Sequence, residues 1–115
     1  MALNNLAFLL VENHGDLDQA LTFAQRARQA LPHFTDVSDT LGQTYLRKQL
    51  TDSAVDTFKE IVAQQPARAI YGYHLGQAYA QKREKQKAIQ ELQTALKSNP
   101  QKDEETQIRQ LLQKL

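Results

Sequence analysis

The chain has 115 residues, 41% of them hydrophobic, which is enough for one small domain. Its 14 basic and 13 acidic residues leave a net charge of +1, which argues against broad binding to nucleic acid or anionic lipid. It has no cysteine, so disulfides and cysteine-ligated metals are excluded. No apolar run approaches the roughly 18 residues of a membrane span, and no signal-peptide pattern opens the chain, so we expect no direct membrane insertion and leave the compartment open.

The first predicted helix covers about residues 2–12, because Leu3, Leu6 and Leu10 recur at helical spacing. No Ser, Thr or Asp stands ahead of Ala2 as a cap. We therefore expect helix-forming sequence upstream and interpret the chain as the C-terminal part of a longer protein. The uncapped helix is also a candidate surface for self-association into a homo-oligomer.

A second helix is predicted over about residues 17–30. Asp16 followed by Gln19 resembles a capping box that opens it, and Gly15 is expected to take the left-handed conformation that closes the first helix. The apolar stripe of this helix is rich in alanine, and small side chains let two helices approach closely. Pro32 ends the pattern, since proline cannot continue a helix.

Four further helices are predicted over residues 35–47, 51–64, 69–82 and 85–97. Gln49 and Arg83 stand where Gly15 stands in the first turn. A non-glycine residue in left-handed geometry costs on the order of 1 kcal/mol, so these two turns are expected to be strained or differently shaped.

A seventh helix is predicted over residues 103–115, with Asp103 as its cap. Ile108, Leu111 and Leu115 fall on one face of it, while the other face stays polar. This pattern is typical of a terminal helix that covers the last open face of a repeat array.

The sequence repeats every 34 residues. Under this shift three sets of residues coincide: Ala20, Ala54 and Ala88; Pro32, Pro66 and Pro100; and Leu41, Gly42 and Tyr45 with Leu75, Gly76 and Tyr79. We interpret the three alanines as contact points between paired helices. With this period and these residues, the stretch from Leu3 to Pro100 resembles the tetratricopeptide repeat family.

The resemblance implies an all-α fold, a right-handed α-solenoid of three helix-turn-helix units plus a C-terminal capping helix. The units would be residues 1–33, 34–67 and 68–101, with the capping helix at residues 103–115. In this family the first helix of each unit lines a concave groove that binds extended peptides or helices. Carried over position by position, the lining would be Asn4, Phe8, Val11, Glu12, Asp36, Asp39, Gln43, Arg47, Ile70, Tyr73, His74, Gln77 and Gln81.

Nine residues of that lining are the predicted binding residues: Asn4, Phe8, Glu12, Asp39, Gln43, Arg47, Tyr73, His74 and Gln77. Phe8 and Tyr73 would act as exposed aromatic anchors of the kind that dominate interfaces. The family's version that clamps chaperone tails uses a cluster of Lys, Asn and Arg. The corresponding positions here are Asn4, Phe8, Thr40, Ile70 and His74, so chaperone-tail binding is not expected.

No constellation predicts catalysis, a metal or a cofactor. None of the three histidines has a His or carboxylate partner one turn away on the same predicted helix, and no phosphate loop or serine elbow is present. The spacing of Asp36 and Asp39 favours a polar helix face over an acid/base pair. The basic segment 82–87 favours a solvated surface over a site for an acidic tail or phosphate.

Two functions remain. The first is a non-catalytic module that binds a peptide or helix of a partner protein. The second is a structural spacer or self-assembly segment of a larger protein. Residues 4–32 and the closing QIRQLLQKL resemble the C-terminal units of large bacterial repeat proteins, including some linked to exopolysaccharide export and sorting.

Overall fold

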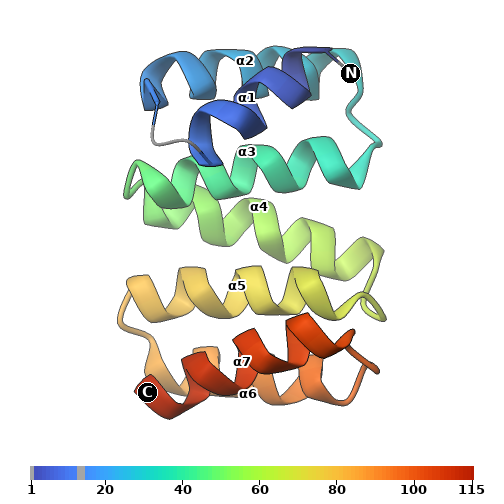
Figure 1. The fold of residues 1–115 in the computed structure, drawn as a ribbon, viewed down its shortest axis with the longest axis vertical. Coiled ribbons are helices and arrows are strands. Elements are labelled where there is room, and N and C mark those ends of the chain that lie inside the picture. Colours follow the sequence, from blue (N-terminus) through green and yellow to red (C-terminus); the bar gives the residue numbers. More distant parts are fainter. Residues whose placement is uncertain (1, 13–14) are drawn as a thin grey trace. The chain divides into compact units, whose positions relative to one another are not determined.

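The computed structural model describes the backbone of residues 2–12 and 15–115, and the side chains of residues 2, 8 and 10–12 lie outside the description (Figure 1). The described residues form helices and no strand. The helices are α1 (Ala2–Glu12), α2 (Leu17–Ala30), α3 (Thr35–Arg47), α4 (Thr51–Gln64), α5 (Ala69–Gln81), α6 (Lys85–Leu96) and α7 (Lys102–Lys114). None of the described helices is long and apolar enough to cross a membrane. The chain divides into two compact units, Met1–Thr57 and Phe58–Leu115.

The α-helical prediction is confirmed, and the predicted ranges of α3 and α4 agree with the structure to the residue. The start of α7 was predicted wrongly. Gln101, not Asp103, is its N-cap, and Glu104 Oε1 accepts a hydrogen bond from the Gln101 N–H at 3.0 Å. Because this glutamate satisfies the N–H ahead of the helix, the helix begins at Lys102. Asp103 lies in the first turn, where its charge faces the positive end of the helix dipole.

The first unit is held together by small side chains where its helices meet. Helix α2 packs against both α1 and α3. Ala7, Ala24 and Leu41 contribute one buried cluster from these three helices. Asp16 caps α2 as predicted, since its Oδ1 accepts from the Gln19 N–H at 3.1 Å. The alanines predicted as contact points are fully buried in both units: Ala20, Ala54 and Ala88.

The core of the second unit is formed by α5, α6 and α7. Helix α7 packs against both α5 and α6, and Ile108 is fully buried in a cluster with Leu92 and Ala95. The helices approach closely at Gly76, where a Cβ atom would lie 2.6 Å from Leu92 Cδ2. A glycine is required there because no larger residue fits without moving the buried leucine.

The α3–α4 and α5–α6 turns have the same left-handed geometry. Gln49 has φ 61° and Arg83 has φ 68°, so of the two alternatives left open by the sequence, strained left-handed geometry holds and a different turn shape does not. In the α3–α4 turn the Leu50 N–H donates to the Tyr45 carbonyl oxygen at 2.9 Å. In the α5–α6 turn the Glu84 N–H donates to the Tyr79 carbonyl oxygen, also at 2.9 Å. These bonds satisfy carbonyl oxygens at the helix ends, which offsets part of the backbone strain. The predicted conformation of Gly15 depends on His14 and lies outside the described residues.

Candidate partner-binding surfaces

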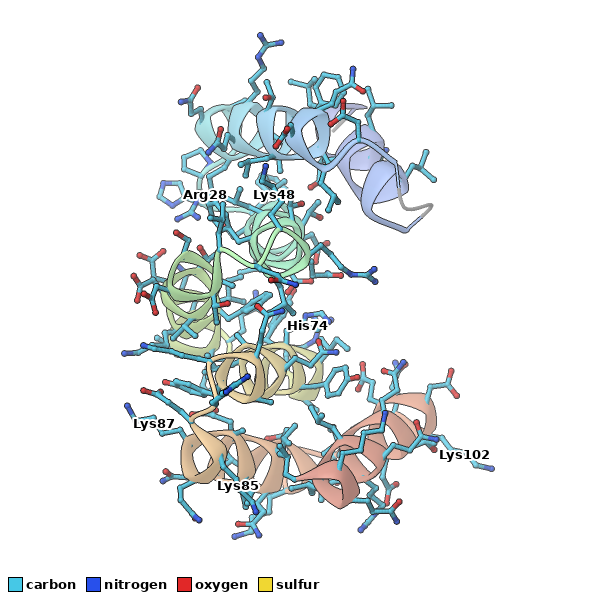
Figure 2. All side chains as sticks on the ribbon, turned by 90° about the vertical axis from the view of Figure 1, so that its left-hand side faces the viewer. Arg28, Lys48, His74, Lys85, Lys87 and Lys102 are labelled. Carbon is cyan, nitrogen blue, oxygen red and sulfur yellow. The ribbon has the colours of Figure 1, made fainter. Side chains whose placement is uncertain are left out.

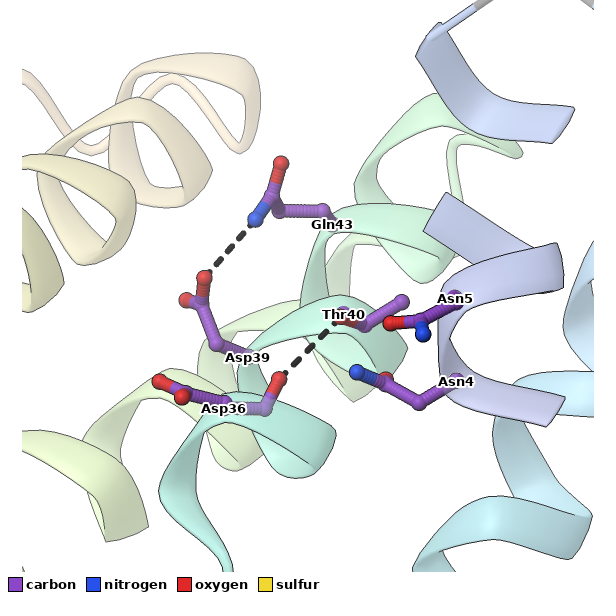
Figure 3. Close-up of a pocket in the computed structure, with 6 residues that line it drawn as sticks. All are labelled: Asn4, Asn5, Asp36, Asp39, Thr40 and Gln43. Carbon is purple, nitrogen blue, oxygen red and sulfur yellow. Dashed lines mark hydrogen bonds between the residues drawn. The ribbon is translucent and has the colours of Figure 1, made fainter. Parts of the chain in front are cut away.

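A polar cleft of about 240 Å3 lies between α1 and α3 (Figure 3). The described residues that line it are Asn4, Asn5, Asp36, Asp39, Thr40 and Gln43. Three of them, Asn4, Asp39 and Gln43, were predicted binding residues. The first unit therefore brings these three side chains together from two helices at one surface.

The α3 wall of the cleft carries two carboxylates, spaced three residues apart. Asp36 is exposed, whereas Asp39 is only 9% exposed. Gln43 Nε2 donates to Asp39 Oδ2 at 2.7 Å, one helical turn away (Figure 3). Because positions four apart lie on one face of a helix, this bond holds the Asp39 carboxylate in a fixed direction. Thr40 Oγ1 donates along the helix to the Asp36 carbonyl oxygen at 3.1 Å.

The α1 wall of the cleft is formed by two amide side chains. Asn4 is only 7% exposed, and its Oδ1 atom has no hydrogen-bond partner among the described residues. An unsatisfied buried acceptor costs about 1–3 kcal/mol. Asn5 is more exposed and was not predicted, because neighbouring residues of a helix point in different directions and only the position of α3 brings both to one cleft.

In the second unit, the α5 surface contains the predicted residues Tyr73, His74 and Gln77. Gln77 Nε2 donates to Tyr73 Oη at 3.1 Å, and the Tyr73 and His74 rings are 5.8 Å apart between centroids. Tyr73 is half-buried and packs against the cluster around Ile108, so it is less exposed than predicted. The cause is α7, which packs beside α5. Burial also raises the pKa of the Tyr73 hydroxyl.

The remaining predicted residues are placed as follows. Arg47 is exposed in the last turn of α3, and the side chains of Phe8 and Glu12 lie outside the description. Among the described residues no group of His, Asp or Glu is arranged to hold a metal ion.

The basic segment at the α5–α6 turn is partly neutralised from within. Lys85 and Lys87 lie in the first turn of α6 (Figure 2). Glu84 Oε2 pairs with Lys87 Nζ at 3.5 Å, and Glu84 Oε1 lies 3.8 Å from Lys82 Nζ. The Lys87 ammonium also lies 5.8 Å from the centre of the Tyr79 ring. These contacts hold part of the positive charge against the surface and agree with a solvated face.

Helix pairs joined by short turns, with fully buried alanines at equivalent positions, define a helical repeat scaffold. The family model of the tetratricopeptide repeat matches residues 40–103, more than half of the chain. The chain belongs to the tetratricopeptide repeat family, as its sequence indicated. No curated protein matches it.

Solved structures of MamA have the same fold. MamA residues 41 to the end, from Desulfovibrio magneticus RS-1, match with a TM-score of 0.75 and 27% identity over 84% of this chain and 54% of that chain. Another crystal structure of MamA matches with a TM-score of 0.68 and 32% identity over 76% of this chain and 52% of that chain. The chain thus spans about half the length of these solved chains.

These similarities confirm the predicted α-solenoid fold class and assign the chain to a class of protein-interaction scaffolds. The division into three units and the nine predicted binding residues stay predictions. So does the resemblance to proteins of exopolysaccharide export, on which none of these similarities bears.

Proposed function

We propose that the chain is a non-catalytic interaction module that binds an extended peptide or a helix of a partner protein. The binding surface is the groove lined by the first helix of each predicted repeat unit. The polar cleft carries this proposal, because Asn4, Asp39 and Gln43 meet there from two helices. A buried unpaired acceptor and a carboxylate held in a fixed direction fit a surface that binds a ligand in one orientation better than they fit the surface of a passive spacer. The family's interaction role supports the same conclusion.

The test is to select peptides that bind the chain from a displayed random library and to map each by chemical-shift perturbation. We expect the largest shifts at the cleft residues, followed by Arg47 and Tyr73. A Gln43→Ala variant should weaken binding, and Gln25→Ala is its matched control, because Gln25 is an exposed glutamine on α2 that does not line the cleft. Shifts confined to α2 and α6, or equal binding by both variants, would contradict the proposal.

A second candidate is a spacer or self-assembly segment of a larger bacterial repeat protein, including one of exopolysaccharide export. Two exposed leucines on α1 favour it, since Leu6 is 44% exposed and Leu9 is 54% exposed. Light scattering over a concentration series should then show a dimer that a Leu9→Lys substitution abolishes. Leu50→Lys is the control, because Leu50 is 43% exposed and lies in the α3–α4 turn. A monomer at all concentrations rejects self-assembly through α1.

A further inference from the structure

We propose that the polar cleft between α1 and α3 receives the guanidinium group of an arginine side chain on the partner. The inference rests on the proposed function and names the partner's chemistry. Three observations carry it: the acceptors that line the cleft, a buried oxygen without a partner, and the charge and size of the space.

The hydrogen-bonding groups of the cleft are mostly acceptors. Carboxylates such as those of Asp36 and Asp39 only accept. The Thr40 hydroxyl proton is already donated to the Asp36 carbonyl oxygen, and Gln43 Nε2 is already directed at Asp39. A carboxylate has two oxygen atoms and accepts several hydrogen bonds at once, so a ligand that enters the cleft meets acceptor oxygens, and a group rich in N–H donors complements them.

Asn4 is the independent observation that points to a ligand. It lines the cleft, it is only 7% exposed, and its Oδ1 atom has no partner among the described residues. Figure 3 shows its side chain extending from α1 toward Thr40 and Asp36 of α3. Buried oxygen atoms are nearly always hydrogen-bonded in folded proteins, so an orphan here indicates a donor that arrives from outside.

The charge of the lining residues and the volume of the cleft indicate that the donor is a cationic side chain. Two of the six described lining residues are acidic and none is basic. The volume of about 240 Å3 is an order of magnitude above the roughly 10–15 Å3 that one water requires. A guanidinium is planar, always charged and carries five N–H donors, so it can bridge a carboxylate and neighbouring amide oxygens at once. An ammonium offers three donors from a single point and spans fewer acceptors.

The direct test is an NMR titration with three blocked tripeptides, acetyl-Gly-Arg-Gly-amide and its citrulline and lysine counterparts. Citrulline keeps the shape of arginine without the charge. We expect the arginine peptide to shift the side-chain amide signals of Asn4, Asn5 and Gln43, with the citrulline peptide binding at least tenfold more weakly and the lysine peptide in between. Binding of the citrulline or lysine peptide as tightly as arginine overturns the proposal, as do shifts elsewhere or none at all.

Two matched variants then test whether the arginine peptide is attracted by the carboxylate in the cleft or by the net charge of the protein. Asp36→Asn should reduce arginine-peptide affinity at least fivefold, and because Asp36 is exposed we expect its exchange to leave the fold intact. Asp56→Asn is the control, since Asp56 is an exposed aspartate on α4 outside the cleft and its exchange removes the same charge. Equal losses in the two variants would mean that net charge alone attracts the peptide, which overturns the cleft assignment. Circular dichroism of both variants checks that helix content is unchanged.

The outcomes separate this inference from the proposed function. If library selection yields binders that contain no arginine and map to α1 and α3, the interaction module stands and the guanidinium site is rejected. If the arginine tripeptide shifts the cleft amides while the library yields no binder, the guanidinium site stands, and the claim that a longer peptide or helix binds along the helices is rejected.

Discussion

The α1–α3 surface of the first unit and the α5–α7 surface of the second contain the same one-turn glutamine hydrogen bond, but they differ in what packs beside it. Asp39 and Gln43 on α3 correspond to Tyr73 and Gln77 on α5 under the 34-residue shift. In each pair the glutamine donates to the side chain four residues earlier, at 2.7 Å in the first and 3.1 Å in the second. Beside α3 the space stays open and polar, whereas Tyr73 packs against the buried cluster that α7 completes. The neighbouring helix therefore decides whether this face lines a polar cleft or packs into a core.

The largest effect should come from opening the packed α5–α7 surface. Ile108→Ala removes a fully buried side chain, so we expect a loss of about 2–5 kcal/mol in the free energy of unfolding, measured by urea denaturation. Leu9→Ala, at a residue 54% exposed on α1, should cost far less. Similar losses in the two variants would mean that α7 does not seal the second unit.

The two glutamine bonds should differ in strength because their acceptors differ in charge. Gln43→Met removes a bond to a carboxylate and should cost about 1.5–3 kcal/mol, whereas Gln77→Met removes a bond to a neutral hydroxyl and should cost about 0.5–1.5 kcal/mol. Methionine keeps the length of the side chain and its helix propensity, so the hydrogen bond is the main loss. Thermal unfolding of both variants measures the difference, and a reversed order contradicts it.

The turns should respond alike in the two units. Gln49 and Arg83 both have positive φ, so Gln49→Gly and Arg83→Gly should each stabilise the protein, by up to about 1 kcal/mol. Gln90→Gly is the control, because Gln90 is exposed within α6 and glycine there should destabilise by about 1 kcal/mol. A gain at one turn alone would show that the two turns are not equivalent.

The smallest effect concerns Glu91 on α6, whose pKa burial raises above its ordinary value of 4.5. A carboxyl with a raised pKa in the folded state adds stability below its unfolded pKa and loses it as the pH rises through the folded pKa. Glu91→Gln should therefore be more stable than the parent chain at neutral pH and lose that advantage near pH 4. Urea unfolding at the two pH values checks this, and a constant difference contradicts it.

The sequence predicted the helices well because alanine stripes, prolines and the Asp16 cap are local signals. The prediction placed the α7 cap wrongly because it considered Asp103 alone, whereas the Gln101 N–H donates to Glu104 Oε1 and the helix starts directly after Gln101. The difference between the two surfaces could not be predicted in the same way. Tyr73 and Asp39 occupy equivalent positions and neither is exposed, but Tyr73 packs against the cluster that α7 completes, whereas Asp39 lines a polar cleft. The unpaired oxygen of Asn4 likewise depends on where α3 lies, which no spacing within α1 specifies.

The repeated glutamine has a consequence for how such a chain can change. Gln43 steadies an aspartate and Gln77 steadies a tyrosine through the same one-turn bond. One backbone thus supports an acidic or an aromatic residue without rebuilding the helix. Exchanges at positions 39 and 73 therefore change the chemistry of these two faces while the glutamine and the helix that carry them stay the same.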